Sequence, residues 1–168
     1  RHRVRNAFFP RQLMVRDVMT PEPKSVLATT PLRDVAGILL PSIFTGLPVV
    51  DELSRPIGLI TQGDLIRKGG LPFRLGLLEE SDRNHRDSLL DQLAQLHAFE
   101  IMTSPVITIG QDRPLSDAVD LMLVKGVKRL PVVDATGQLV GMISRLDIFR
   151  TVMREAPDWN DFRSQRIE

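Results

Sequence analysis

Two stretches of this chain show the same succession of apolar and polar segments. In each, a short β-branched run, a polar turn and a second apolar run precede a helical pattern, which predicts a β-hairpin that leads into a helix. The clearer copy occupies residues 130–149. The same pattern occurs 83 positions earlier, so residues 47–51 match 130–134 and residues 58–64 match 141–147. The chain is therefore an internal duplication.

A further helix is predicted before each hairpin. Apolar residues recur at helical spacing from about Pro114 to Val124, and residues 32–40 repeat the pattern. Pro31 and Pro114 suit the first turn of a helix, where the missing N–H costs nothing. Pro41 ends the first copy early, because proline cannot continue a helix. Short strands are predicted ahead of these helices, at 25–28 and 106–109, and the helices after the hairpins are predicted at 63–68 and 145–155.

These elements divide the chain into five segments. A helix with leucines on one face is predicted within the connection between the repeats, and we interpret it as a cover for the core rather than a partner-recognition helix. The expected segments are a linker at 1–13, the first repeat at 14–69, a helical connection at 70–97, the second repeat at 98–155 and a tail at 156–168.

Composition excludes several classes of function. The net charge of +1 gives no global field for nucleic acid or an anionic membrane. The chain has no cysteine, which excludes disulfides and thiolate metal sites, and its 3 histidines share no metal spacing. No membrane segment, signal peptide or catalytic triad is predicted, so we expect a cytoplasmic protein, or the cytoplasmic part of a larger one, without an enzyme's active site. The chain begins at Arg1 without a methionine, and we expect it to be a segment of a longer protein.

Three motifs recur in the same order in both repeats. They are Met-Thr before the first strand, Leu-Pro-Val-Val-Asp on the second and Gly-x-x-[Ser/Thr]-x-x-Asp after the third. This arrangement, over roughly residues 15–153, resembles the CBS domain, named after cystathionine β-synthase, and two in tandem resemble a Bateman module. The resemblance implies an α+β fold of two β-α-β-β-α repeats packed about a pseudo-two-fold axis.

The resemblance also implies a function. Members of that family bind adenosine-containing ligands such as AMP, ADP, ATP or S-adenosylmethionine in clefts between the repeats, and they regulate attached enzymes, channels or transporters without being catalysts. We therefore expect an allosteric module that controls an output domain in the same or another chain. A homodimer through the helices of the repeats is expected as well. The alternative is a ligand-free dimerisation module.

The start of the last helix is the main candidate site. Ser144 and Asp147 have the spacing of a capping box, and capping alone would explain both residues. A helix start at the edge of a sheet is also a place where anions bind. An ionised Asp accepts hydrogen bonds from both hydroxyls of a ribose, so we assign Asp147 and its counterpart Asp64 to ribose. Thr61 corresponds to Ser144, and the resemblance implies that both hydroxyls donate to the ribose or to the phosphate.

The remaining candidates rest on the resemblance to the family. Ile107 and Thr108, with Ser25 and Val26 in the first repeat, match positions whose backbone borders the adenine. Their side chains fit ordinary strand residues equally well. A basic residue before the second strand matches a phosphate position, with a solvated strand entry as the alternative. The residues at this position are Lys128 and Arg129 in the second repeat and Thr45 and Gly46 in the first, so phosphate recognition is not duplicated.

Overall fold

A computed structural model of the chain describes residues 12–41, 46–69 and 83–155. Its residues form two compact units. The first-repeat unit is Pro23–Val106, and the second-repeat unit joins Arg1–Glu22 to Ile107–Glu168. Each unit has its own hydrophobic core and its own sheet.

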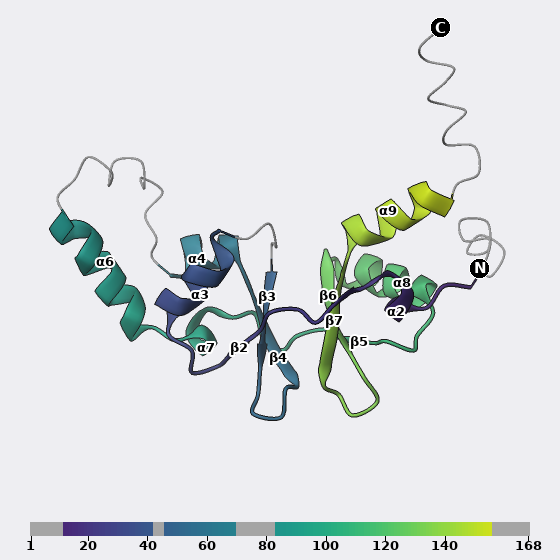
Figure 1. Cartoon of the computed structure of the whole chain (residues 1–168), viewed down its shortest axis with the longest axis horizontal. Helices are drawn as coiled ribbons and strands as arrows, with labels where there is room; N and C mark the ends of the chain where they lie inside the picture. The colour runs from purple at the N-terminus through teal and green to yellow at the C-terminus, as the bar shows by residue number, and fades with distance from the viewer. Residues whose placement is uncertain (1–11, 42–45, 70–82, 156–168) are drawn as a thin grey trace, which may run out of the picture. The chain divides into compact units, whose positions relative to one another are not determined.

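The first-repeat unit contains a three-stranded sheet in the order β2-β3-β4 (Figure 1). The strand β2 runs parallel to β3, and β3 and β4 form an antiparallel hairpin. The elements are β2 (Val26–Leu27), α3 (Leu32–Leu39), β3 (Gly46–Val50), β4 (Pro56–Thr61), α4 (Gln62–Arg67), α6 (Arg83–Gln95) and α7 (Ala98–Ile101).

The second-repeat unit contains a four-stranded sheet in the order β1-β7-β6-β5. The hairpin β6–β7 is antiparallel, β5 runs parallel to β6, and β1 adds an antiparallel edge to β7. The elements are α2 (Val15–Val18), β1 (Thr20–Pro21), β5 (Ile109–Gly110), α8 (Leu115–Lys125), β6 (Arg129–Val133), β7 (Leu139–Ser144) and α9 (Arg145–Glu155).

The predicted helices bury the faces that their apolar spacing indicates. In α3, Leu32, Val35 and Leu39 are buried in the core, and α8 buries Leu115 and Met122 in the same way. The helix predicted within the connection is α6, and its Leu93 is 2% exposed in the core of the first-repeat unit. The interpretation of that helix as a cover for the core is therefore confirmed at this residue.

The opening segments of the two repeats are exchanged between the units, which the sequence pattern did not indicate. In the second-repeat unit, Met19 packs against Gly141 of β7, and β1 pairs with that strand. In the first-repeat unit, Met102 packs in the same way against Gly58 of β4. A Cβ atom at either glycine would overlap the methionine sulfur, so the glycine allows the close approach. Each hairpin thus receives the Met-Thr segment that opens the other repeat.

Both hairpin turns are organised by the aspartate that ends the Leu-Pro-Val-Val-Asp motif. Asp134 Oδ1 accepts hydrogen bonds from the backbone N–H groups of Thr136 and Gln138, at 2.9 and 3.0 Å. Asp51 Oδ1 accepts one from the backbone N–H of Arg55 at 2.9 Å. The Thr136 hydroxyl lowers the pKa of Asp134, and the Arg55 backbone N–H lowers the pKa of Asp51. Both hairpins thus have the same kind of turn contact, which gives each aspartate a structural role.

The first strand of each repeat is shorter than the sequence predicts. The strand expected at 106–109 is β5, which covers only Ile109–Gly110, so Ile107 and Thr108 precede it. In the same way Ser25 precedes β2. The prediction of strand was wrong at Ser25, Ala28 and 106–108, because each strand is held only by parallel pairing to two residues at the end of β3 or β6.

Candidate functional site

One end of the sheet in the second-repeat unit brings together four of the predicted site residues. Arg129 begins β6, Ser144 ends β7, and the two are directly opposite each other in the antiparallel register. The backbone N–H of Arg145 donates to the carbonyl of Lys128 at 2.9 Å, which ties the start of α9 to the residue before β6. Asp147 lies in the first turn of α9. Two basic residues, a hydroxyl and a carboxylate therefore meet at the start of this helix.

Ser144 and Asp147 form the predicted capping box. Asp147 Oδ2 accepts hydrogen bonds from the backbone N–H of Ser144 at 2.9 Å and from its hydroxyl at 3.0 Å. The backbone N–H of Asp147 donates to the Ser144 hydroxyl oxygen at 3.2 Å. Among the described residues, the hydrogen bonds to this carboxylate all go to Oδ2. Capping therefore leaves the acceptor capacity of Oδ1 for a ligand.

Asp147 also lines a cavity of about 480 Å³ at α2 and α9. The remaining lining combines apolar side chains with two arginines one helical turn apart: Val18, Phe149, Arg150, Met153 and Arg154. Arg154 donates to the Thr151 hydroxyl at 3.4 Å. Asp147 thus borders an open, partly cationic space.

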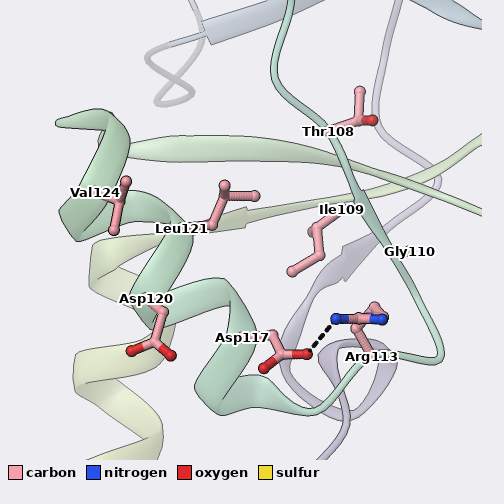
Figure 2. Close-up of a pocket in the computed structure, with 8 residues that line it drawn as sticks. All are labelled: Thr108, Ile109, Gly110, Arg113, Asp117, Asp120, Leu121 and Val124. Carbon is pink, nitrogen blue, oxygen red and sulfur yellow. Dashed lines mark ion pairs between the residues drawn. The ribbon is translucent and has the colours of Figure 1, made fainter.

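Thr108 lines a different cavity, of about 470 Å³, beside α8 (Figure 2). Arg113 and Asp117 form an ion pair of 2.8 Å across one side of it. The structure therefore does not place Thr108 and Asp147 in one cavity. Because β5 is parallel to β6, however, the residues before β5 lie toward the end of the sheet where Arg129 begins β6. Ile107 packs against the core of this unit.

The matching end of the first-repeat sheet is built differently. Gly46 is directly opposite Thr61, where the other unit has Arg129 opposite Ser144. Thr61 and Asp64 form a second capping box, in which Asp64 Oδ2 accepts from the backbone N–H of Thr61 at 2.9 Å. Asp64 is only 4% exposed. This end of the first-repeat sheet therefore has the same capping box but no basic side chain at the first residue of β3.

The other first-repeat candidates contribute less. Val26 is 6% exposed and belongs to the core, and Ser25 is an exposed residue before β2. Thr45 lies outside the residues that the structure describes. Because the Val26 side chain is packed in the core, only its backbone could contact a ligand.

Three basic residues near the two carboxylates were missed by the sequence analysis. Arg67 and Lys68 form ion pairs with Asp64 Oδ1 at 3.8 and 3.5 Å, and Arg150 lines the cavity with Asp147. Each of these residues follows an aspartate of the same helix by three or four positions, and this spacing could have indicated the contacts from the sequence. Within the described ranges there is no group of three His, Asp or Glu side chains suited to a metal, and no helix long and apolar enough to cross a membrane.

Comparison with known proteins identifies the family. The CBS domain matches this chain twice, at residues 15–70 and 98–154. The chain therefore belongs to the CBS domain family and carries two of these domains in tandem. Its mixed α+β architecture agrees with the predicted fold class and with solved CBS-pair structures.

Three solved structures illustrate the similarity. The CBS domain of a CBS domain containing membrane protein from Sphaerobacter thermophilus is 28% identical, with a TM-score of 0.73, 89% of this chain and 94% of that chain covered. CBSX2 in complex with AMP is 28% identical, with a TM-score of 0.63 and coverages of 84% and 96%; this protein is from Arabidopsis thaliana. The CBS domain pair of protein MJ0100, in complex with 5′-methylthioadenosine and S-adenosyl-L-methionine, is 25% identical, with a TM-score of 0.64 and coverages of 84% and 96%.

One curated relative extends well beyond the matched region. An uncharacterized protein from Methanopyrus kandleri is 35% identical over 102 residues, which make up 61% of this chain and 43% of that protein. The chain thus spans less than half the length of this relative.

Proposed function

We propose that this chain is a regulatory module that binds an adenine nucleotide at the sheet end formed by Arg129, Ser144 and Asp147. The ligand class is AMP, ADP, ATP or S-adenosylmethionine, and binding controls an attached or partner domain. The observation that carries the proposal is the capping box of Ser144 and Asp147 directly opposite a strand that begins with arginine. This arrangement places an acceptor for hydroxyl groups beside a cation.

Each part of a nucleotide has a candidate contact there. The Oδ1 atom of Asp147 accepts hydrogen bonds from the ribose hydroxyls, since Oδ2 is used within the capping box. Arg129 and Lys128 provide positive charge for a phosphate, or for the carboxylate of S-adenosylmethionine. The backbone of Ile107 and Thr108 borders the adenine. In the first repeat, the residues that match these positions by sequence are Thr61 and Asp64, together with Ser25, Val26, Thr45 and Gly46.

Two relatives support the ligand class. CBSX2 has been solved with AMP, and the MJ0100 pair with 5′-methylthioadenosine and S-adenosyl-L-methionine. All three ligands carry an adenosine group, so the shared chemistry is a ribose and an adenine rather than a phosphate. Asp147 supplies the ribose part of this chemistry.

Regulation would work by a population shift. A ligand favours the conformation to which it binds more tightly, by no more than the difference in its affinity for the two conformations. Because the proposed site contains binding groups and no arrangement for bond making, we propose a sensor rather than an enzyme, acting in the cytoplasm or on the cytoplasmic side of a larger protein.

A homodimer is the second part of the proposal. The outer faces of α8 and α9 carry exposed apolar side chains: Leu123 is 70%, Val124 78%, Leu146 54% and Phe149 60% exposed. Apolar surface of this kind is typical of an interface between proteins. The same observation supports the alternative function, a dimerisation module without a ligand.

A screen of melting temperature distinguishes the two functions. Adenosine, AMP, ADP, ATP, S-adenosylmethionine and NAD would each be added in excess, with guanosine and GMP as matched controls. A ligand that binds the folded chain raises the melting temperature. The sensor function predicts a rise with at least one adenosine compound and none with the guanosine compounds. No rise with any compound, in a chain that is dimeric, would favour the alternative.

A further inference from the structure

The two aspartates of the repeated motif have different surroundings. Asp64 Oδ1 lies 3.5 Å from Lys68 Nζ and 3.8 Å from an Arg67 guanidinium nitrogen, and the residue is 4% exposed. Asp147 is partly exposed and lines a cavity. The carboxylate of the first repeat is therefore neutralised by side chains of its own helix, whereas that of the second repeat is open.

Lys68 is the first cause of this difference. Its ammonium group also donates to the backbone carbonyl of Ile101 at 3.4 Å, which holds it between α4 and α7. The matching residue in the second repeat, 83 positions on, is Thr151. The Thr151 hydroxyl donates to the backbone carbonyl of Asp147 at 3.0 Å and brings no charge to the carboxylate.

Gly63 is the second cause. A Cβ atom at Gly63 would lie 2.9 Å from a terminal nitrogen of Arg67, so the arginine folds back over the first turn of α4 because no side chain is present there. The matching residue is Leu146, whose side chain is 54% exposed on α9. The arginine at the position that matches Arg67, Arg150, lines the cavity instead.

We infer that Lys68 and Arg67 close the first-repeat position to ribose, so that each chain binds one nucleotide, at Asp147. This inference rests on the proposed function and sharpens it. Both oxygens of Asp64 are engaged, Oδ2 by the capping box and Oδ1 by two cations, and a ribose diol would have to displace charged partners from a buried carboxylate. Asp64 is a structural residue, and Lys68 and Arg67 determine how many ligands the chain takes.

Calorimetric titration with the nucleotide that raises the melting temperature most tests the inference, because it measures the number of sites per chain. We expect one site for the wild-type chain and for Asp64→Asn, and binding that is at least roughly 10-fold weaker for Asp147→Asn. The variant with Arg67→Ala and Lys68→Thr, which copies the second repeat at position 68, should show two sites. Adding Asp64→Asn to that variant should return it to one site.

The outcomes separate the inference from the proposed function. Two sites in the wild-type chain, or loss of binding in Asp64→Asn while Asp147→Asn binds as tightly as the wild type, would overturn the inference and keep the nucleotide sensor. One site in the variant with both cations removed would overturn the role of Lys68 and Arg67. Binding that no substitution at Asp64 or Asp147 changes would overturn the proposed site as well, and absence of binding by all variants would overturn both. Circular dichroism of each variant shows whether it has folded.

Discussion

Arg129 and Ser144 are cross-strand partners at the end of the β6–β7 hairpin, and the matching pair in the other unit is Gly46 and Thr61. The hydroxyl is kept in both repeats, whereas the guanidinium is present in one. The sheet end that holds Asp147 is therefore the one with positive charge for a phosphate.

Replacement of Arg129 by alanine should weaken AMP binding more than adenosine binding. A charge-assisted hydrogen bond to phosphate contributes roughly 1.5 to 3 kcal/mol, or about 10- to 100-fold in affinity. Titration calorimetry with AMP and adenosine measures the ratio in both proteins. Arg113→Ala, which removes an arginine beside α8, is the matched control. An unchanged ratio in Arg129→Ala would show that Arg129 does not contact the phosphate.

Gly58 and Gly141, which pack against Met102 and Met19, should not tolerate a side chain. Gly141→Ala places a Cβ atom against the sulfur of Met19, and overpacking of this kind costs about 1 to 3 kcal/mol of folding free energy. Urea unfolding measures the loss. In Gly37→Ala, nothing lies within 4 Å of the added Cβ, and removal of a helical glycine should stabilise the chain by about 0.5 to 1 kcal/mol. Equal effects in the two variants would contradict the packing described for Met19.

The sequence predicts the elements that depend on neighbouring residues better than the contacts between residues far apart in the chain. The helices and hairpins follow from local apolar spacing, and α8, for example, begins and ends within one residue of the prediction at Pro114 and Val124. The exchange of Met19 and Met102 is a contact between distant segments, and no local pattern encodes it. The short strand β5 was misplaced because its limits depend on the end of β6.

The site was predictable in its residue types and less so in its environment. The capping boxes at Ser144 and Thr61 follow from spacing and are confirmed as structural features. The difference between Asp64 and Asp147 depends on where Lys68 points and on the missing side chain of Gly63, which become visible only in three dimensions.

The turn aspartates predict a specific loss of stability in acid. The Thr136 hydroxyl and nearby backbone N–H groups hold the pKa of Asp134 below its ordinary value. Because the folded-state pKa is the lower one, the carboxylate stabilises the fold at pH values above the unfolded pKa of about 3.9, and this contribution is lost as the pH falls through the folded pKa. Asp134→Ala should therefore lower the melting temperature at neutral pH.

The measurement is the difference in melting temperature between the wild-type chain and Asp134→Ala as a function of pH. The difference should shrink below about pH 4, since the wild-type carboxyl becomes protonated there. Asp51→Ala should behave similarly, because the backbone N–H of Arg55 lowers the pKa of Asp51. A difference that stays constant across this range would show that the aspartate acts through something other than its charge.

The proposed dimer predicts the effect of a charge on α8. Val124 is 78% exposed, and Val124→Glu would bury a carboxylate in an interface formed by this helix, so the chain should become monomeric. Light scattering at high protein concentration measures the mass. Leu53→Glu, at a residue that is 59% exposed in the turn of the first hairpin, is the control and should leave the mass unchanged. A wild-type chain that is monomeric would contradict the proposed dimer.

The binding of AMP to the wild-type chain and to Asp147→Asn tests the central proposal most directly. Asparagine keeps an oxygen that accepts the capping hydrogen bond from the backbone N–H of Ser144, but it loses the negative charge that favours the ribose hydroxyls. Calorimetry should therefore show at least a roughly 10-fold weaker affinity, since a hydrogen bond to a charged group contributes about 1.5 to 3 kcal/mol, with little change in melting temperature without ligand. Equal affinities would contradict the account and leave Asp147 with its capping role alone.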